Sequence, residues 1–118
     1  MPARVVIVHN QPSFIEELST ALKSRQIETA AFPDPLVALP ALEASERIEL
    51  LITRVQFPPG RSNGIALAQM TRLRRREVKV LFVARPEFRE AADGLGEFIP
   101  APATIADVVA TAARLLGV

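Results

Sequence analysis

Residues 50–64 read LLITRVQFPPGRSNG, and this segment carries the strongest signals for the fold. Its apolar start, together with Glu49, predicts a short buried strand over 49–53, because parallel strands covered on both faces read as continuous apolar runs. The prolines and glycines that follow exclude regular structure over 56–64. A helix is expected from about Ile65 to Arg75. A strand, a loop and a helix in this order form the repeating unit of a layered α/β fold.

The same unit recurs on both sides of this segment. Further strands are expected over 4–8, 28–32, 78–83 and 97–100, and further helices over 35–45, over 86–93, from residue 12 and from about residue 104. Ser13 and Glu16 have capping-box spacing next to Pro12, and Asp34 has the character of a helix N-cap. Pro40 should kink or shorten the second helix.

Five strands that alternate with five helices predict an α/β fold with right-handed crossovers and a parallel sheet. No G-x-G-x-x-G follows the first strand, so a dinucleotide-binding fold has no support. Pro100 cannot donate a ladder hydrogen bond, which places the fifth strand at a sheet edge. We therefore expect a flavodoxin-like (βα)5 three-layer sandwich with the strand order 2-1-3-4-5. Residues 1–118 should form one domain, with no output domain.

The composition excludes several kinds of site. The chain has no cysteine and one histidine, which excludes disulfides, thiolate chemistry and multi-histidine metal clusters. The apolar runs are too short to span a bilayer and no signal peptide is visible, so we expect a cytoplasmic protein with no membrane partner. The formal net charge is +1, but residues 51–90 carry nine basic and three acidic side chains.

Part of this basic excess lies at the end of the third predicted helix. It comprises Arg72, Arg74, Arg75, Arg76 and Lys79. No aromatic stacking platform or recognition helix accompanies the cluster, and the helix dipole favours cations at helix C-termini. We therefore expect a solvated helix end and no nucleic-acid partner.

With these elements in place, the chain resembles a response-regulator receiver domain of two-component signalling over essentially its whole length. The resemblance lies in segments 5–10, 50–60 with Asn63-Gly64, 80–84 and 98–102, in this order and spacing. It implies the fold predicted above and a role in bacterial signal transduction.

The resemblance also implies the place of a phosphorylation site, and every position of that site is changed. Receivers hold Mg²⁺ with an acidic pair after the first strand, where this chain has His9 and Asn10. They phosphorylate an aspartate at the end of the third strand, where this chain has Arg54. A hydroxyl residue after the fourth strand and a lysine before the fifth-strand proline are replaced by Ala84 and Ala101. The chain thus resembles a degenerate pseudo-receiver.

Physical chemistry agrees with the loss of this site. Mg²⁺ requires anionic oxygen ligands, and the changed positions offer no carboxylate. A guanidinium about 4 Å from a divalent ion is repelled by roughly 8 kcal/mol at an effective dielectric constant of about 20. We therefore expect no phosphoacceptor, no Mg²⁺ or other cofactor and no catalytic residue, so that the chain is not an enzyme.

Two interpretations of the changed site stay open. Arg54 could fill the space of the metal, bond to loop carbonyls or pair with Glu87, and thereby fix the loops in one state. Alternatively, an anion such as phosphate, a nucleotide or a partner's carboxylate could bind to the basic residues of this edge, namely His9, Arg54, Arg61 and Arg85. His9 could be a strand-end residue bonded to a loop, or it could act as a pH switch, with a pKa near ~6.5.

A partner surface is expected on the last strand and the last helix. Phe98 stands where receivers place their switch aromatic, and without a hydroxyl at position 84 it should be permanently packed. The last helix is rich in alanine, and its small apolar residues, among them Val109, Ala110 and Ala113, should leave a flat contact surface. In receivers this region commonly forms the dimer or partner face, so a homodimer is a further possibility.

We therefore interpret the sequence as a stand-alone, phosphorylation-independent protein–protein interaction module in a bacterial two-component or phosphorelay pathway. Its partner would be a histidine kinase, a phosphotransfer protein or an effector. Two alternatives stay open. One is a sensor of small anions that uses Arg54, Arg61 and Arg85, and the other is a phosphorelay receiver with unusual acceptor chemistry.

Overall fold

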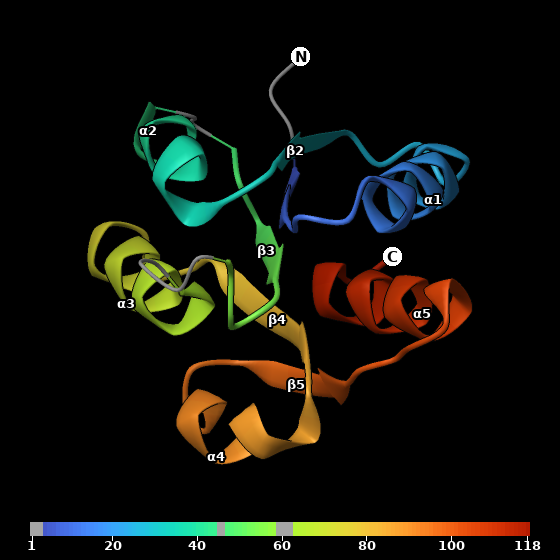
Figure 1. Cartoon of the computed structure of the whole chain (residues 1–118). Coiled ribbons are helices and arrows are strands. Elements are labelled where there is room, and N and C mark those ends of the chain that lie inside the picture. Colours follow the sequence, from blue (N-terminus) through green and yellow to red (C-terminus); the bar gives the residue numbers. More distant parts are fainter. Residues whose placement is uncertain (1–3, 45–46, 59–62) are drawn as a thin grey trace.

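The computed structural model describes residues 4–44, 47–58 and 63–118. Within them, one parallel sheet has the strand order β2-β1-β3-β4-β5 (Figure 1). The strands are β1 (Val5–Val8), β2 (Thr29–Phe32), β3 (Leu50–Thr53), β4 (Lys79–Ala84) and β5 (Glu97–Pro100). The predicted flavodoxin-like fold and its strand order are confirmed, and Pro100 lies in an edge strand as expected.

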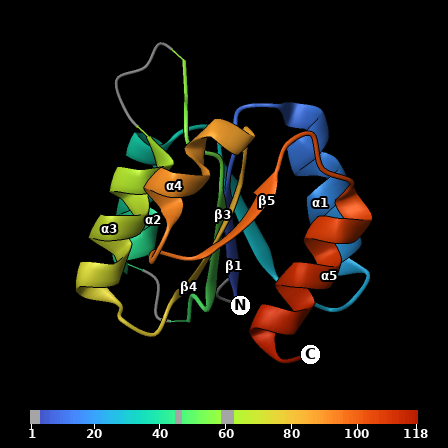
Figure 2. The same cartoon turned by 90° about the horizontal axis from the view of Figure 1, so that it is seen from below.

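Helices follow the strands and cover the sheet on both faces. They are α1 (Pro12–Lys23), α2 (Pro35–Ala44), α3 (Gly64–Arg74), the short 3-10 helix η1 (Pro86–Phe88), α4 (Arg89–Ala92) and α5 (Ile105–Leu116). Helices α1 and α5 lie on one face, and α2, α3 and α4 lie on the other (Figure 2). The result is the expected three-layer sandwich.

The two central strands form the middle of the core. Every residue of β1 and β3 is buried, because each strand pairs on both sides and is covered on both faces. Residues of alternating parity point to opposite faces. Ile7 and Ile52 pack towards α1 and α5, whereas Val6 and Leu51 pack towards the other helices. Burial of each such side chain contributes about 1.5–3 kcal/mol to stability.

The start of α1 differs from the prediction. Pro12 occupies the first helical turn, and the N-cap is Gln11, whose side chain makes no capping hydrogen bond. The predicted capping box of Ser13 and Glu16 is wrong, because a capping serine must precede the first helical residue and Ser13 follows it. At α2 the prediction is confirmed, since Oδ1 of Asp34 accepts hydrogen bonds from two backbone N–H groups of the first turn.

Helix α2 runs through Pro40 to Ala44, close to the end expected near residue 45, so of the two effects expected of Pro40, a kink or a shortening, the shortening is wrong. Ala38 and Leu42 lie on either side of the proline, and both are buried in the core. Packing of these two side chains against the sheet stabilises the helix on both sides of Pro40, and tertiary contacts thereby override local helix propensity.

Candidate functional site

The carboxyl ends of the parallel strands meet at one edge of the sheet, and the predicted site residues come together there. His9 follows β1, Arg54 follows β3, Ala84 ends β4 and Ala101 follows β5. These four residues line a hollow of about 310 Å³, which we call the rim hollow; its other lining residues are Gln11, Val55, Gln56, Val83, Arg85, Phe88 and Pro102. Arg61, also predicted here, lies outside the described residues.

Arg54 joins two of the loops at this edge. Its Nη1 donates a hydrogen bond to Oδ1 of Asn10, and its backbone N–H donates to the carbonyl of Val8 at 3.4 Å. The guanidinium carbon lies 5.9 Å from the centre of the buried Phe57 ring. The side chain thereby connects the loop after β1 to the loop after β3.

Of the alternatives for Arg54, an ion pair with Glu87 is wrong. Glu87 pairs instead with Arg85, with 2.7 Å between Nη2 and Oε2, because these two residues lie close together in the same turn. No carboxylate of the described residues pairs with Arg54. Burial and, to a smaller degree, the positive charge of Arg85 lower the pKa of Arg54. The guanidinium stays protonated, so a cation that has no carboxylate partner in the described segments lies at the rim hollow.

His9 is neutral at neutral pH. It is 7% exposed, its ring stacks on Phe14 at 4.2 Å between centroids, and its Nδ1 accepts a hydrogen bond of 3.1 Å from the backbone N–H of Gln11. Burial and then the charge of Arg54 lower the pKa of His9 to about 4. These contacts agree with the alternative of a strand-end residue bonded to the following loop. With a pKa of about 4, His9 is not a switch near pH 6.5 and adds no positive charge to the rim hollow at neutral pH.

The residues of this edge do not fit a Mg²⁺ ion. The side chains that line the hollow include a neutral imidazole and the amides of Gln11 and Gln56 but no carboxylate, and the nearby amide oxygen of Asn10 already accepts from the Arg54 guanidinium. Elsewhere in the described part of the chain, no cluster of three or more histidine, aspartate or glutamate side chains could hold a metal.

Ala84 and Ala101 place only methyl groups at this edge of the sheet. Ala84 is buried, and its carbonyl accepts a hydrogen bond of 2.7 Å from the N–H of Ala101, which continues the pairing of β4 with β5. Phe98 is half-buried against the core, and the guanidinium carbon of Arg89 lies 4.9 Å from its ring centre. The predicted packed position of Phe98 agrees with these contacts.

Gly64 was not singled out as a site residue by the sequence, yet it positions Arg54. A Cβ atom at residue 64 would lie 1.9 Å from the carbonyl oxygen of Arg54, so only glycine lets α3 begin there. The N–H of Gly64 donates to the carbonyl of Val55 at 2.8 Å, and Oγ1 of Thr53 donates to the Arg54 carbonyl at 2.8 Å. The only sequence signal was the Asn-Gly pair at the end of the loop.

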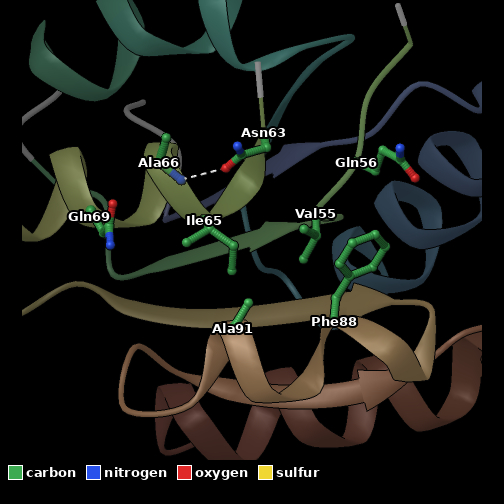
Figure 3. Close-up of a pocket in the computed structure, with 8 residues that line it drawn as sticks. All are labelled: Val55, Gln56, Asn63, Ile65, Ala66, Gln69, Phe88 and Ala91. Atoms are coloured by element: carbon green, nitrogen blue, oxygen red, sulfur yellow. Dashed lines mark hydrogen bonds between the residues drawn. The ribbon is translucent and has the colours of Figure 1, made fainter. Parts of the chain in front are cut away.

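A second hollow, of about 470 Å³, adjoins the rim hollow between the start of α3 and the segment formed by η1 and α4 (Figure 3). We call it the α3–α4 groove. It shares Val55, Gln56 and Phe88 with the rim hollow, and its other lining residues are Asn63, Ile65, Ala66, Gln69 and Ala91. The sequence did not predict this groove, because its walls come from separate elements.

The sequence predicts a solvated basic cluster at the end of α3, but two of its arginines bind backbone carbonyl groups of other segments. Nε and Nη2 of Arg72 donate to the carbonyls of Val78 and Leu95 at 2.9 and 2.8 Å, and Nε of Arg75 donates to the carbonyl of Leu42 at 2.9 Å. These cations satisfy carbonyl groups at the ends of neighbouring elements, where backbone oxygens lack partners. Their role in the structure is therefore to cap other segments.

The contact surface predicted on α5 is smaller than expected. Val109 and Ala113 are only 6% and 4% exposed, whereas Ala110 is exposed. Val109 and Ala113 lie beside Val108 and Ala112 on the stripe that covers the sheet, so they belong to the core face of the helix. The prediction that they form a free surface is wrong.

No helix of the described residues is long and apolar enough to cross a membrane.

Comparison with known proteins gives a structural answer only. No protein-family model matches the sequence, and no curated protein matches it either. Among solved structures, the chain is similar to an adenylate cyclase from Rhodopirellula baltica, with a TM-score of 0.86 and 18% identity over 99% of this chain and 89% of that one.

Two further similar structures are response regulators. A receiver domain protein from Methanospirillum hungatei has a TM-score of 0.85 at 17% identity, over 99% of this chain and 95% of that chain. TrrA from Thermotoga maritima, solved in complex with Mg²⁺ and BeF, has a TM-score of 0.83 at 16% identity, over 96% and 98%. At these identities the likeness establishes the fold. The chain therefore has the fold of a response-regulator receiver domain.

Proposed function

We propose that this chain is a receiver-like signalling module that works through protein contacts, without phosphorylation and without catalysing a reaction. The observation that carries the proposal is the Arg54–Asn10 hydrogen bond at the end of β3. A guanidinium and an amide replace the acceptor and one of the metal-binding acids that the resemblance to receivers implies for these positions.

The chemistry of the rim hollow supports the first half of this proposal. Arg54 has no nucleophilic oxygen, and its positive charge repels the divalent ion that aids phosphoryl transfer. Ala84 and Ala101 offer methyl groups where a hydroxyl and an ammonium would contact the phosphoryl group. TrrA, which has the same fold, was solved with Mg²⁺ and BeF. The residues of the present chain are unsuited to that pair of ligands.

The contacts around Arg54 support the second half, a surface held in one state. Arg54 ties the loops after β1 and β3 together, and Gly64 fixes the approach of α3 to the Arg54 carbonyl. Phe98 is packed under Arg89, and Ala84 provides no hydroxyl through which the end of β3 could act on Phe98. The module would therefore present its binding surface constitutively.

The partners that fit such a module are a histidine kinase, a phosphotransfer protein or an effector of a two-component pathway. A second copy of the chain, bound through β5 and α5, is another possible partner. On α5 that contact would use Ala110, which is exposed, and not the buried Val109 or Ala113.

Incubation with acetyl phosphate and Mg²⁺, followed by intact-mass measurement, tests the proposal. A phosphorylatable receiver treated in parallel serves as the positive control. We expect no gain in mass for this chain, and ¹H–¹⁵N spectra that do not change when Mg²⁺ and beryllium fluoride are added. A stable gain of one phosphoryl group would overturn the proposal and favour a receiver with unusual acceptor chemistry.

A further inference from the structure

We propose that the rim hollow and the α3–α4 groove form one binding site for an extended partner segment that carries a carboxylate close to a large apolar side chain. The inference rests on the proposed function, and it specifies the surface that would be used and the chemistry that the surface would recognise.

The rim hollow supplies the positive end of this site. Arg54 and Arg85 both line it, and the charge of Arg85 contributes to the lowered pKa of Arg54, so the two cations act on each other. The Arg54 guanidinium has five N–H donors, of which Nη1 serves Asn10. A carboxylate from outside the chain would be its missing counter-charge, held by charge-assisted hydrogen bonds.

Arg85 can also contribute to binding. Its partner Glu87 forms an exposed ion pair, with side chains that are 58% and 61% exposed for Arg85 and Glu87. Exposed pairs of this kind contribute only about 0.2–1 kcal/mol, so a ligand carboxylate can replace Glu87 at little cost. Glu87 is therefore a weak internal competitor for the same site.

The α3–α4 groove supplies the apolar end. Ile65, Phe88 and Ala91 form apolar walls, and Gln56 and Gln69 place amide groups beside them (Figure 3). Within the described part of the chain, no ionisable side chain lines this groove. Its volume of about 470 Å³ falls within the range of about 300–1,000 Å³ that is usual for ligand sites. The glutamine amides can both donate to and accept from an extended peptide backbone.

The two hollows adjoin, so one ligand can occupy both of them and must carry a group suited to each. They share Val55, Gln56 and Phe88, and the Arg85 guanidinium carbon lies 5.8 Å from the Phe88 ring centre. A small anion alone would leave the groove empty, and a purely apolar segment would leave Arg54 without a counter-charge. A peptide segment with both groups, one or two residues apart, satisfies both ends.

Selection from a random peptide library displayed on phage, with the intact chain as bait, tests this inference. We expect enriched peptides to carry Asp or Glu one or two positions from Leu, Ile or Phe. Fluorescence anisotropy with a labelled enriched peptide then measures Kd. Arg54→Ala removes the positive charge of the rim hollow, and Ala91→Gln fills part of the α3–α4 groove with a larger polar side chain. Each substitution should weaken binding by about tenfold or more. Glu87→Gln should strengthen binding by removing the internal competitor.

Matched controls separate the site from general effects of charge and size. Arg25→Ala removes the same charge in the turn after α1, at the opposite edge of the sheet, and should leave Kd unchanged. Ala110→Gln makes the same substitution as Ala91→Gln on the exposed side of α5 and should also leave Kd unchanged. Circular dichroism of each variant confirms that it is folded.

Several outcomes would overturn the inference. These are a selection that enriches no acidic and apolar pattern, enriched peptides that bind Arg54→Ala as tightly as the wild type, and binding lost in Ala110→Gln but kept in Ala91→Gln. Saturable binding of inorganic phosphate or ATP without any enriched peptide would assign the rim hollow to a small anion instead. Each of these results leaves the acetyl phosphate test of the proposed function unaffected.

Discussion

Two arginines at opposite edges of the sheet have opposite surroundings. At the edge where the strands begin, Arg4 donates twice to the carboxylate of Glu49, at 2.7 and 3.1 Å. That hydrogen bond raises the pKa of Arg4 and lowers the pKa of Glu49. At the edge where the strands end, Arg54 has only the neutral amide of Asn10, and burial lowers its pKa.

The two arginines therefore differ in how their positive charges are balanced. The Arg4–Glu49 pair satisfies both charges and contributes to stability. Arg54 is half-buried, and its positive charge has no carboxylate partner among the described residues. Perturbed charged groups beside a hollow are typical of functional sites, and the α/β architecture places its sites at this same edge.

The largest effect is expected where the backbone supports Arg54. Gly64→Ala should lower the free energy of unfolding by about 3 kcal/mol, because the added Cβ would overlap the Arg54 carbonyl at 1.9 Å. Gly94→Ala is the control: its Cβ would meet no atom within 4 Å, so its cost is limited to the positive φ, about 1 kcal/mol. Urea denaturation measures both. Equal losses would show that the contact at Gly64 is relieved without strain.

Acid should affect the two edges over different pH ranges. The folded pKa of His9, about 4, lies below its unfolded value of 6.5. The unfolded chain therefore binds the extra proton first, and stability falls by up to about 3 kcal/mol as the pH drops from about 6.5 to 4. Glu49 has a lowered folded pKa, so its contribution is present above its unfolded value of 4.5 and is lost below that pH.

The variant His9→Asn isolates the histidine contribution. Asparagine keeps a side-chain acceptor for the Gln11 N–H but does not titrate, so the stability decrease between pH 6.5 and 4 should become shallower. Thermal unfolding followed across this range in both proteins checks the prediction. An unchanged pH profile in His9→Asn would mean that His9 is not a buried neutral imidazole.

The smallest changes in the free energy of unfolding are expected for two substitutions that compare the surroundings of Arg4 and Arg54. Glu49→Gln should lower the free energy of unfolding by about 0.5–1 kcal/mol, in the range of partly exposed ion pairs. Arg54→Met should change the free energy of unfolding by no more than about 0.5 kcal/mol, because Arg54 is half-buried, its hydrogen bond to Asn10 is exposed, and it has no carboxylate partner among the described residues. A larger loss in Arg54→Met than in Glu49→Gln would assign Arg54 a purely structural role.

Much of the fold could be predicted from local sequence patterns. The continuous apolar runs at 5–8 and 50–53 indicated central strands, and Pro100 indicated an edge strand. These patterns lie within a few consecutive residues, so they predict an element without knowledge of the segments that pack against it. The absence of carboxylates at residues 9, 10 and 54 could be read directly from the sequence, because folding does not change the type of a side chain.

The partners and the burial of the individual side chains were decided only by the tertiary structure. Asn10 became the partner of Arg54 from 44 residues away, and Val109 and Ala113 turned towards the sheet. The neutral state of His9 and the groove beside Phe88 likewise depend on which elements pack together. Burial and the pairing of charges are set by neighbours in space, and a local pattern in one sequence does not contain those neighbours.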